Sequence, residues 1–348
     1  MQDPRKQCAP QNCLAGVGCV VLNQSVRANR GTLAGLILWV WVASGCCHLP
    51  MNHRGAERPP LPAAIAASFD YPKTNKLVWR ERVLGAARRY NLKRIELPAV
   101  AQTAGTTRNI VLDCYQPLAT NKTPVILVLP ILGGSYELEE HFADYFARHG
   151  LAAVIVHRER INPSLQTMES FDGMFRETVL DNKQAIDWLE TQPEIDPGRI
   201  GVFGASMGGI KGALLVELED RVQAAVLGLT GGDLPYILTH TTERGIARRR
   251  KSWLGEHKVS VAELKEHLQQ QISCDPAAFA PYVQPAKVLL VLAAGDTVVP
   301  IKRGLELRRK MGKPETILLM AGHYSALVYI PYIQHQALKF YRKRFAAK

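Results

Sequence analysis

The chain has 348 residues, of which 47% are hydrophobic and 21% charged. This composition is typical of a globular protein with one large domain or two small ones, and it excludes a disordered or fibrous chain. The formal net charge is +12, but no arginine-rich arm with interleaved aromatic residues accompanies it, so the sequence predicts no nucleic-acid partner.

The first recognisable pattern is an export signal over residues 27–45. Arg27 and Arg30 precede a short apolar run at 33–43, and small residues follow, which is the order of parts in a signal peptide. The run is shorter than the roughly 20 apolar residues of a membrane-spanning helix. Residues 1–26 precede a signal that normally begins near the initiator methionine, and we interpret them as an extension from a start site assigned too far upstream.

The signal ends in "ASGC", residues 43–46, which resembles the lipobox of bacterial lipoproteins, although Ala43 stands where that pattern prefers leucine. The resemblance implies that Cys46 is lipidated and anchors the chain to a membrane of the cell envelope. Cys47, in place of an aspartate, favours the periplasmic face of the outer membrane over the inner membrane. A plain secretory signal and an ordinary buried segment are the alternatives. Residues 46–69, rich in proline and alanine, predict a tether.

From residue 70 to residue 348, runs typical of strands alternate with helical stretches. Strands are expected at 108–115, 124–130, 151–157, 199–204, 222–229, 286–296 and 315–320, and helices at 137–149, 171–190, from 207, at 302–311 and at the C-terminus. Runs such as "VILVL" are continuously apolar, as in parallel strands that helices cover on both faces. The predicted fold class is therefore α/β, with a mostly parallel central sheet flanked by helices.

A glycine-bounded serine follows one of these strands. Residues 204–208 read G-x-S-x-G, placed between a predicted strand and a predicted helix, which is the context of a nucleophile elbow. Gly204 and Gly208 are expected because side chains there would clash with backbone in so tight a turn. The pattern predicts that Ser206 is a nucleophile at the N-terminus of a helix.

The chain also supplies a base and an acid in the order that this arrangement uses. Asp296 ends a predicted strand, and His323 follows the last one, so that Ser206, Asp296 and His323 all lie at carboxyl ends of strands. His323 is expected to deprotonate Ser206 while Asp296 orients the imidazole. Asp233 also follows a strand and is the alternative acid.

These motifs resemble the α/β-hydrolase family, and most closely its dienelactone-hydrolase-like and acyltransferase or thioesterase-like branches. The resemblance covers most of the chain from Asp70. Dienelactone hydrolases carry a cysteine nucleophile where Ser206 stands, so the resemblance implies cleavage of an ester or thioester of a small molecule instead. One oxyanion amide should come from Met207, and another from Ile131 or Leu132 in the loop "PILGGS".

More than fifty residues, about 232–285, separate two predicted strands, and an insertion at this place of the fold commonly forms a helical cap. Its basic run at 247–251 is expected to be a solvated helix face, or else a contact for anionic lipid or an acidic substrate.

The function predicted is a serine hydrolase that uses an acyl-enzyme intermediate and neither metal nor organic cofactor. An acyltransferase and a non-catalytic binding lipoprotein are the alternatives, and the sequence leaves open the oligomeric state and a bridge between Cys114 and Cys274.

Overall fold

The computed structural model describes residues 46–51, 58–73, 77–100, 108–158 and 167–346. The predicted extension at 1–26 and the predicted signal peptide at 27–45 lie outside these ranges. Within them, no helix is both long and apolar enough to cross a membrane.

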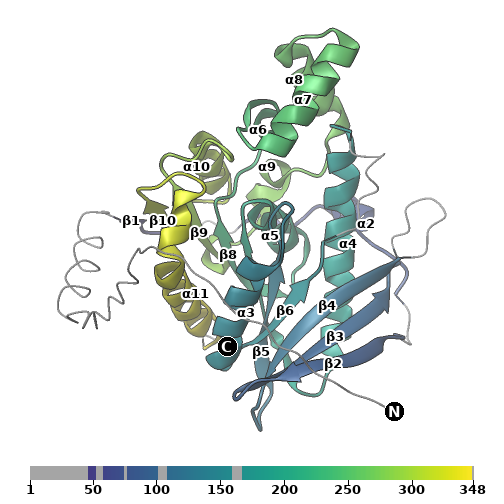
Figure 1. The fold of residues 1–348 in the computed structure, drawn as a ribbon, viewed down its shortest axis with the longest axis vertical. Helices are drawn as coiled ribbons and strands as arrows, with labels where there is room; N and C mark the ends of the chain where they lie inside the picture. The colour runs from purple at the N-terminus through teal and green to yellow at the C-terminus, as the bar shows by residue number, and fades with distance from the viewer. Residues whose placement is uncertain (1–45, 52–57, 74–76, 101–107, 159–166, 347–348) are drawn as a thin grey trace, which may run out of the picture. The chain divides into compact units, whose positions relative to one another are not determined.

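One sheet organises the domain, in the strand order β1-β10-β9-β8-β7-β5-β6-β4-β3-β2 (Figure 1). The strands from β10 to β6 in this order are parallel, whereas β1 at one edge and β4, β3 and β2 at the other pair antiparallel. The strand bounds are β1 Cys47–Leu49, β2 Arg80–Ala86, β3 Tyr90–Pro98, β4 Asn109–Pro117, β5 Thr123–Leu129, β6 Ala152–Val156, β7 Ile195–Ala205, β8 Val222–Gly228, β9 Val288–Ala293 and β10 Glu315–Leu319.

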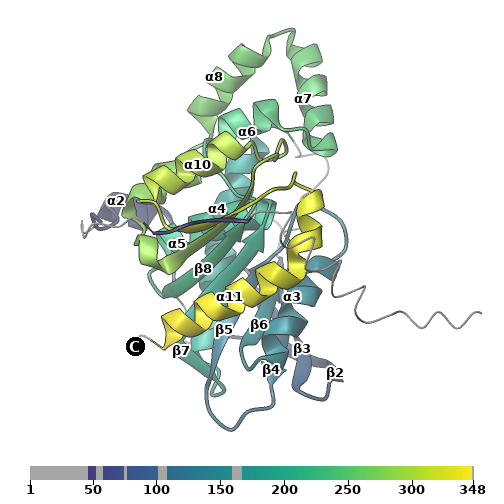
Figure 2. The same ribbon diagram turned by 90° about the vertical axis from the view of Figure 1, so that its left-hand side faces the viewer.

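Helices cover both faces of this sheet and form the insertion between β8 and β9. Helices α3 and α11 pack on one face, and α4, α5 and α10 pack on the other (Figure 2). The helix bounds are α2 Ala63–Ser68, α3 Glu137–Arg148, α4 Ser170–Glu190, α5 Met207–Leu218, α6 Leu234–His240, α7 Arg244–His257, α8 Val261–Gln271, α9 Pro276–Phe279, α10 Ile301–Lys310 and α11 Ile330–Phe345, with a 3₁₀ helix η4 at Ser325–Tyr329. The predicted α/β fold class is confirmed.

The strand order explains why one edge of the sheet can hold a site. From β5 the chain crosses one face through α3 to reach β6, and then crosses the other face through α4 to reach β7 on the opposite side of β5. The loops that follow β5 and β7 therefore diverge at a topological switch point, where parallel α/β sheets bind their ligands.

The sequence predicted neither β2 nor β3. Six of the seven residues of β2 are exposed, because it is the edge strand and has a neighbour on one side only. A strand of this kind carries no continuous apolar run, so the pattern that marks the buried parallel strands is missing from it.

The predicted tether at 46–69 needs correction, because its described parts pack on the domain. Strand β1 pairs with β10, and the Arg58 guanidinium donates hydrogen bonds to the backbone carbonyls of Ala280, Val283 and Lys310. Phe69 is 1% exposed. The folded unit therefore includes this segment instead of beginning at residue 70. The segment pairs with the open edge of the sheet at β10 and removes the Phe69 side chain from water.

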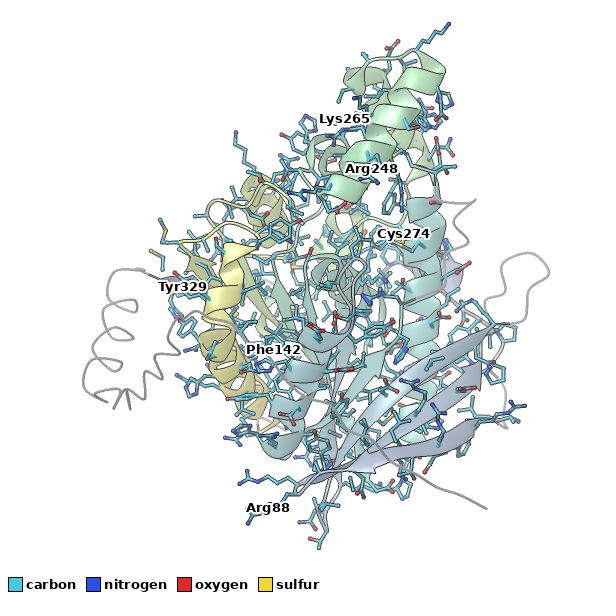
Figure 3. The ribbon with its side chains drawn as sticks, viewed as in Figure 1. Arg88, Phe142, Arg248, Lys265, Cys274 and Tyr329 are labelled. Carbon is cyan, nitrogen blue, oxygen red and sulfur yellow. The ribbon has the colours of Figure 1, made fainter. Side chains whose placement is uncertain are left out.

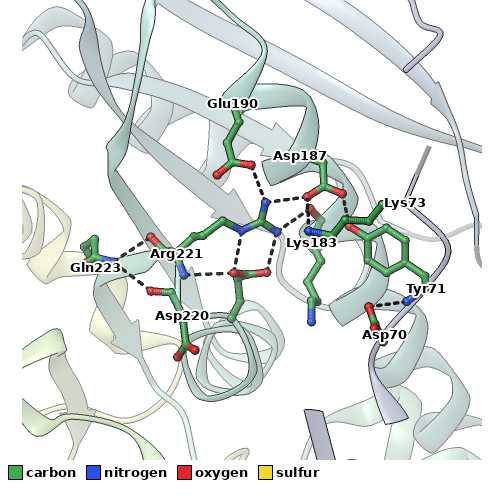
Figure 4. A network of polar contacts seen from close by, with 10 residues as sticks. Asp70, Tyr71, Lys73, Lys183, Asp187, Glu190, Asp220, Arg221 and Gln223 are labelled. Carbon is green, nitrogen blue, oxygen red and sulfur yellow. Dashed lines mark hydrogen bonds and ion pairs between the residues drawn. The ribbon is translucent and has the colours of Figure 1, made fainter. Parts of the chain in front are cut away.

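A polar network continues this attachment beyond residue 70 (Figure 4). Tyr71 donates its hydroxyl to Asp187 on α4, and Arg221 donates to Asp187 at 2.6 Å, to Glu190 at 2.8 Å and to both carboxylate oxygens of Glu219. The Arg221 guanidinium thus joins α4 to the turn between α5 and β8, which suits this planar donor of several hydrogen bonds. Tyr71 adds the N-terminal segment to the same network through Asp187.

Candidate active site

The serine singled out in the sequence lies on a strained turn between β7 and α5. Ser206 has φ 55° and ψ −122°, a backbone conformation that costs energy for a residue with a side chain and that recurs at active sites. A Cβ on Gly204 would lie 2.1 Å from the Gly208 carbonyl oxygen, and one on Gly208 would lie 2.1 Å from the Leu129 carbonyl oxygen. Both positions therefore require glycine.

The structure brings the three predicted triad residues together. His323 Nε2 lies 2.9 Å from Ser206 Oγ, and His323 Nδ1 lies 2.8 Å from Asp296 Oδ2. The other Asp296 oxygen, Oδ1, accepts the backbone N–H groups of Val298 and Val299, each at 2.9 Å. Asp296 is 5% exposed, and both of its carboxylate oxygens have hydrogen-bond partners. The carboxylate can therefore hold the imidazole in one orientation.

Asp233, the alternative acid, is used elsewhere. Its Oδ2 accepts a hydrogen bond from Arg303 at 2.6 Å, and its Oδ1 caps α6 through the backbone N–H of Tyr236. Of the two aspartates, only Asp296 contacts His323.

The loop after β5 is prepared for an oxyanion, with one change from the prediction. The Ile131 N–H donates to the buried carboxylate of Glu139 at 2.7 Å, so it is already satisfied. The Leu132 N–H donates to no other residue in the described part of the chain. Met207 is the first residue of α5, where backbone N–H groups lack partners within the helix. Met207 and Leu132 thus remain the candidate donors.

Arg158, which the sequence analysis did not single out, holds this loop from the outside. Its guanidinium donates to the carbonyls of Gly133 at 2.6 Å and Gly134 at 2.5 Å, and more weakly to those of Ile131 and Ser135. It also lies 4.2 Å from the ring centroid of Tyr136. The only available signal was strand order, because Arg158 follows β6, the parallel neighbour of β5.

A cavity of about 200 Å³ opens beside Ser206 and His323. Its lining includes Ile131 and Leu132 of the oxyanion loop and Glu243 at the start of α7, together with apolar residues of the sheet, α3, η4 and α11. The Glu243 carboxylate caps α7, accepting the backbone N–H groups of Gly245 and Ile246. The candidate nucleophile therefore faces a partly open cavity with few polar groups.

The insertion at 232–285 folds into α6, α7, α8 and α9, and the upper helices α7 and α8 carry Arg248 and Lys265 (Figure 3). In the basic run at 247–251, Arg248 and Lys251 are exposed. Arg250, by contrast, turns inward and donates to the Leu238 and Thr241 carbonyls at 3.1 Å each. The run is therefore only partly a solvated face.

Cys114 and Cys274 are both buried and both unpaired, and burial raises the pKa of each thiol. Cys46 is partly buried against the core on the α11 face, and nothing in the structure tests its lipidation. Among the described residues, no three His, Cys, Asp or Glu side chains gather as a metal site would require.

Comparison with known proteins adds a family and a fold. The model of the X-Pro dipeptidyl-peptidase (S15) family matches residues 102–277, half of the chain. Two uncharacterized proteins from two strains of Mycobacterium tuberculosis are each 30% identical over 177 residues, which is 50% of this chain and 40% of theirs. The chain thus spans less than half the length of these curated relatives.

Solved structures share the fold over about four fifths of this chain. The acetyl xylan esterase from Paenibacillus sp. R4 matches 82% of this chain and 100% of its own, with TM-score 0.60 and 14% identity. Acetyl xylan esterase 1 from Thermoanaerobacterium sp. matches 81% and 95%, with TM-score 0.59 and 16% identity. At such identities the likeness establishes the α/β-hydrolase fold alone.

Proposed function

Since the chain belongs to the X-Pro dipeptidyl-peptidase (S15) family and has the α/β-hydrolase fold, we propose that it is a serine hydrolase that cleaves a carboxylic ester or thioester. The observation that carries this proposal is the hydrogen-bonded chain from Ser206 Oγ through His323 to Asp296. The solved structures of similar fold include esterases, which supports an ester over a peptide bond.

In the proposed reaction, Ser206 Oγ attacks the acyl carbonyl carbon while its proton passes to His323 Nε2. The Met207 and Leu132 N–H groups stabilise the resulting oxyanion. The bond from carbon to the leaving oxygen or sulfur then breaks, and the leaving group takes the proton from His323. Water attacks the acyl-enzyme, passes a proton to His323, and the acid departs as Ser206 Oγ is reprotonated. This sequence needs neither metal nor organic cofactor.

The test is labelling and turnover with a matched variant. The wild-type chain and Ser206→Ala are treated with a fluorophosphonate and supplied with p-nitrophenyl esters. We expect one covalent adduct, located on Ser206 by mass spectrometry, and loss of turnover on the order of 10⁶-fold in the variant. A well-folded wild type that neither reacts nor hydrolyses any ester would leave the binding-module alternative.

Two further arms separate the other activities. An alanyl-prolyl p-nitroanilide measures the reaction for which the family is described, and a competing alcohol in the ester assay measures transfer, because an acyltransferase would yield the new ester in place of the acid. A hydrolase yields mainly acid at low alcohol concentration, because water then attacks most of the acyl-enzyme.

We also propose that the chain is exported and attached to the cell envelope through Cys46. The supporting observation is the "ASGC" pattern alone. Metabolic labelling with a fatty acid in a bacterial host, followed by membrane fractionation of wild type and Cys46→Ala, tests it. Soluble, unlabelled wild-type protein would contradict the anchor.

A further inference from the structure

The cavity beside Ser206 has an exposed mouth and a closed inner end. Tyr324 is 64% exposed and Leu327 is 54% exposed, and both line it on the outside. The residues at its inner end come from α3 and the sheet, each is less than 4% exposed, and they are Phe142, Phe203, Val226 and Val291. Ser206 and His323 line the same cavity and are intermediate in exposure between these two groups.

The cavity follows from the layers of the fold. Phe142 on α3 and Leu327 on η4 both line it, and α3 and α11 lie side by side on the same face of the sheet (Figure 2). Ile330 and Ile333 of α11 complete the wall. A molecule entering beside Ser206 therefore reaches the space between the sheet and these two helices.

The polarity of the lining is uneven. Its polar side chains are those of Ser206, Glu243, His323 and Tyr324, and the remaining lining residues are apolar or glycine. A hydroxylated group, such as a sugar, would leave its hydroxyls without partners at the inner end, at a cost in free energy. A hydrocarbon chain gains from the same surface by leaving water.

Building on the proposed function, we propose that the inner end is an acyl-chain pocket and that the substrate class is an ester or thioester of an unbranched fatty acid of medium length. A cavity of about 200 Å³ is several times the roughly 30 Å³ that one water molecule takes in the liquid, so it has room for a chain of several methylene groups. An acetyl group leaves most of this space unfilled.

The chemistry assigns the pocket to the acyl part rather than to the alcohol. The alcohol leaves first, while the acyl group is still bonded to Ser206 Oγ. An alcohol held at the closed end would have to pass the acyl group to escape, whereas one at the mouth, beside His323 and the exposed Tyr324, departs directly. The acyl chain therefore occupies the inner end.

The experiment measures kcat/KM for p-nitrophenyl esters from acetate to laurate with the full chain. Each added methylene that enters the pocket should raise kcat/KM about fourfold, from the burial of its apolar surface. We expect a rise of about two hundredfold from acetate to hexanoate, then a plateau or a fall once the chain exceeds the cavity.

Two lining variants move the optimum in opposite directions. Phe142→Leu enlarges the inner end and should shift the optimum to longer chains. Phe146→Leu is the matched control, because Phe146 lies one turn further along α3, is fully buried and does not line the cavity. Val226→Phe should fill the inner end and shift the optimum to shorter chains. Thermal unfolding shows whether each variant is folded. If Val226→Phe does not fold, the comparison of Phe142→Leu with Phe146→Leu tests the pocket by itself.

The outcomes separate this inference from the proposed function. A profile that is highest at acetate, or an equal response of Phe142→Leu and Phe146→Leu, would overturn the acyl pocket while leaving an ester hydrolase in place. No turnover of any ester, together with no phosphonate adduct on Ser206, would overturn both. A medium-chain optimum that moves in Phe142→Leu alone supports the pocket.

Discussion

Arg158 illustrates how one side chain outside the triad can govern the site. Its guanidinium contacts the carbonyls of every residue from 131 to 135 except Leu132, in a loop where Gly133 and Gly134 have φ of 68° and 76°. With the carbonyls held by the guanidinium, the loop keeps the conformation in which the Leu132 N–H stays unbonded. Arg158 is thus a positioning residue for the candidate oxyanion site.

Replacing Arg158 with lysine should lower kcat more than it raises KM. A single ammonium cannot span the carbonyls that the planar guanidinium reaches, so the loop amide loses its position, and the expected loss in kcat approaches the roughly 10²- to 10³-fold cost of removing an oxyanion donor. Steady-state kinetics measure it. Arg148→Lys, at an exposed arginine that pairs with Asp144 near the end of α3, is the matched control, and equal kinetics for both variants would contradict the role of Arg158.

Two glutamates near the end of α5 should respond to pH with opposite sign. Burial, and secondarily the charge of Asp275, raises the pKa of Glu217 well above its ordinary value, and neither of its carboxylate oxygens has a hydrogen-bond partner. Burial also raises the pKa of Glu219, but the hydrogen bonds and charge of Arg221 outweigh this effect and leave the pKa lowered.

A raised carboxyl pKa lowers stability as pH rises above the unfolded-state pKa, because the unfolded chain ionises first. Glu217→Gln, which cannot ionise, should therefore gain stability over wild type as pH rises from about 4.5. Glu219→Gln should be less stable than wild type above about pH 4.5, because it gives up an ionised pair, and this deficit should shrink as pH falls below that value. Thermal unfolding between pH 2 and pH 8 measures both differences, and differences of the same sign at neutral pH would contradict this assignment.

At the scale of elements, a second network ties the oxyanion loop to the antiparallel strands. Arg94 on β3 donates two hydrogen bonds to Asp113 on β4, at 2.7 and 2.8 Å, and His157 Nε2 after β6 lies 2.8 Å from the same carboxylate. The His157 ring packs on Tyr136, with 4.5 Å between centroids, and the Tyr136 hydroxyl accepts the Arg158 N–H. Strand β3, absent from the sequence prediction, thereby supports the candidate site together with β4.

Asp113→Asn should remove a stabilisation that is present at neutral pH and lost in acid. Burial raises the pKa of Asp113, but the hydrogen bonds and charges of Arg94 and His157 lower it further, to about 2. Because the folded-state pKa lies below the unfolded value, this stabilisation is present above about pH 4 and is lost as pH falls toward 2. We expect the variant to be less stable by about 2 kcal/mol at neutral pH. Denaturant titrations at pH 7 and pH 2 measure the difference, and an equal difference at both pH values would count against it.

At the scale of the whole molecule, the segment before residue 70 should contribute to folding. It supplies β1, the Arg58 contacts and the buried Phe69, whose ring meets that of Phe279 edge to face at 5.8 Å. A chain that begins at Asp70 should unfold roughly 5 to 10 °C lower than the full chain, from the loss of a buried aromatic side chain and a strand. A chain that begins at Cys46 is the control, and it should match the full chain. Equal unfolding temperatures for both truncations would restore the tether interpretation.

The sequence by itself determined the features whose physical cause is local. Continuously apolar runs identified β5, β6 and β9, because a strand covered on both faces has no polar side to display. The glycines around Ser206 predicted a turn too tight for side chains. The order of serine, acid and histidine along the chain predicted the contacts among Ser206, His323 and Asp296.

Only the tertiary structure decided what depends on contacts between distant segments. Asp233 and Asp296 each follow a strand. They differ in their partners, since Asp233 accepts a hydrogen bond from Arg303 whereas Asp296 contacts His323. The sequence made Ile131 and Leu132 equal candidates for the oxyanion donor, and the structure separates them because the Ile131 N–H donates to Glu139. Arg158, the docking of β1 and the apolar cavity between α3 and α11 left no local mark, because each depends on strand order and on how helices far apart in the chain pack over the sheet.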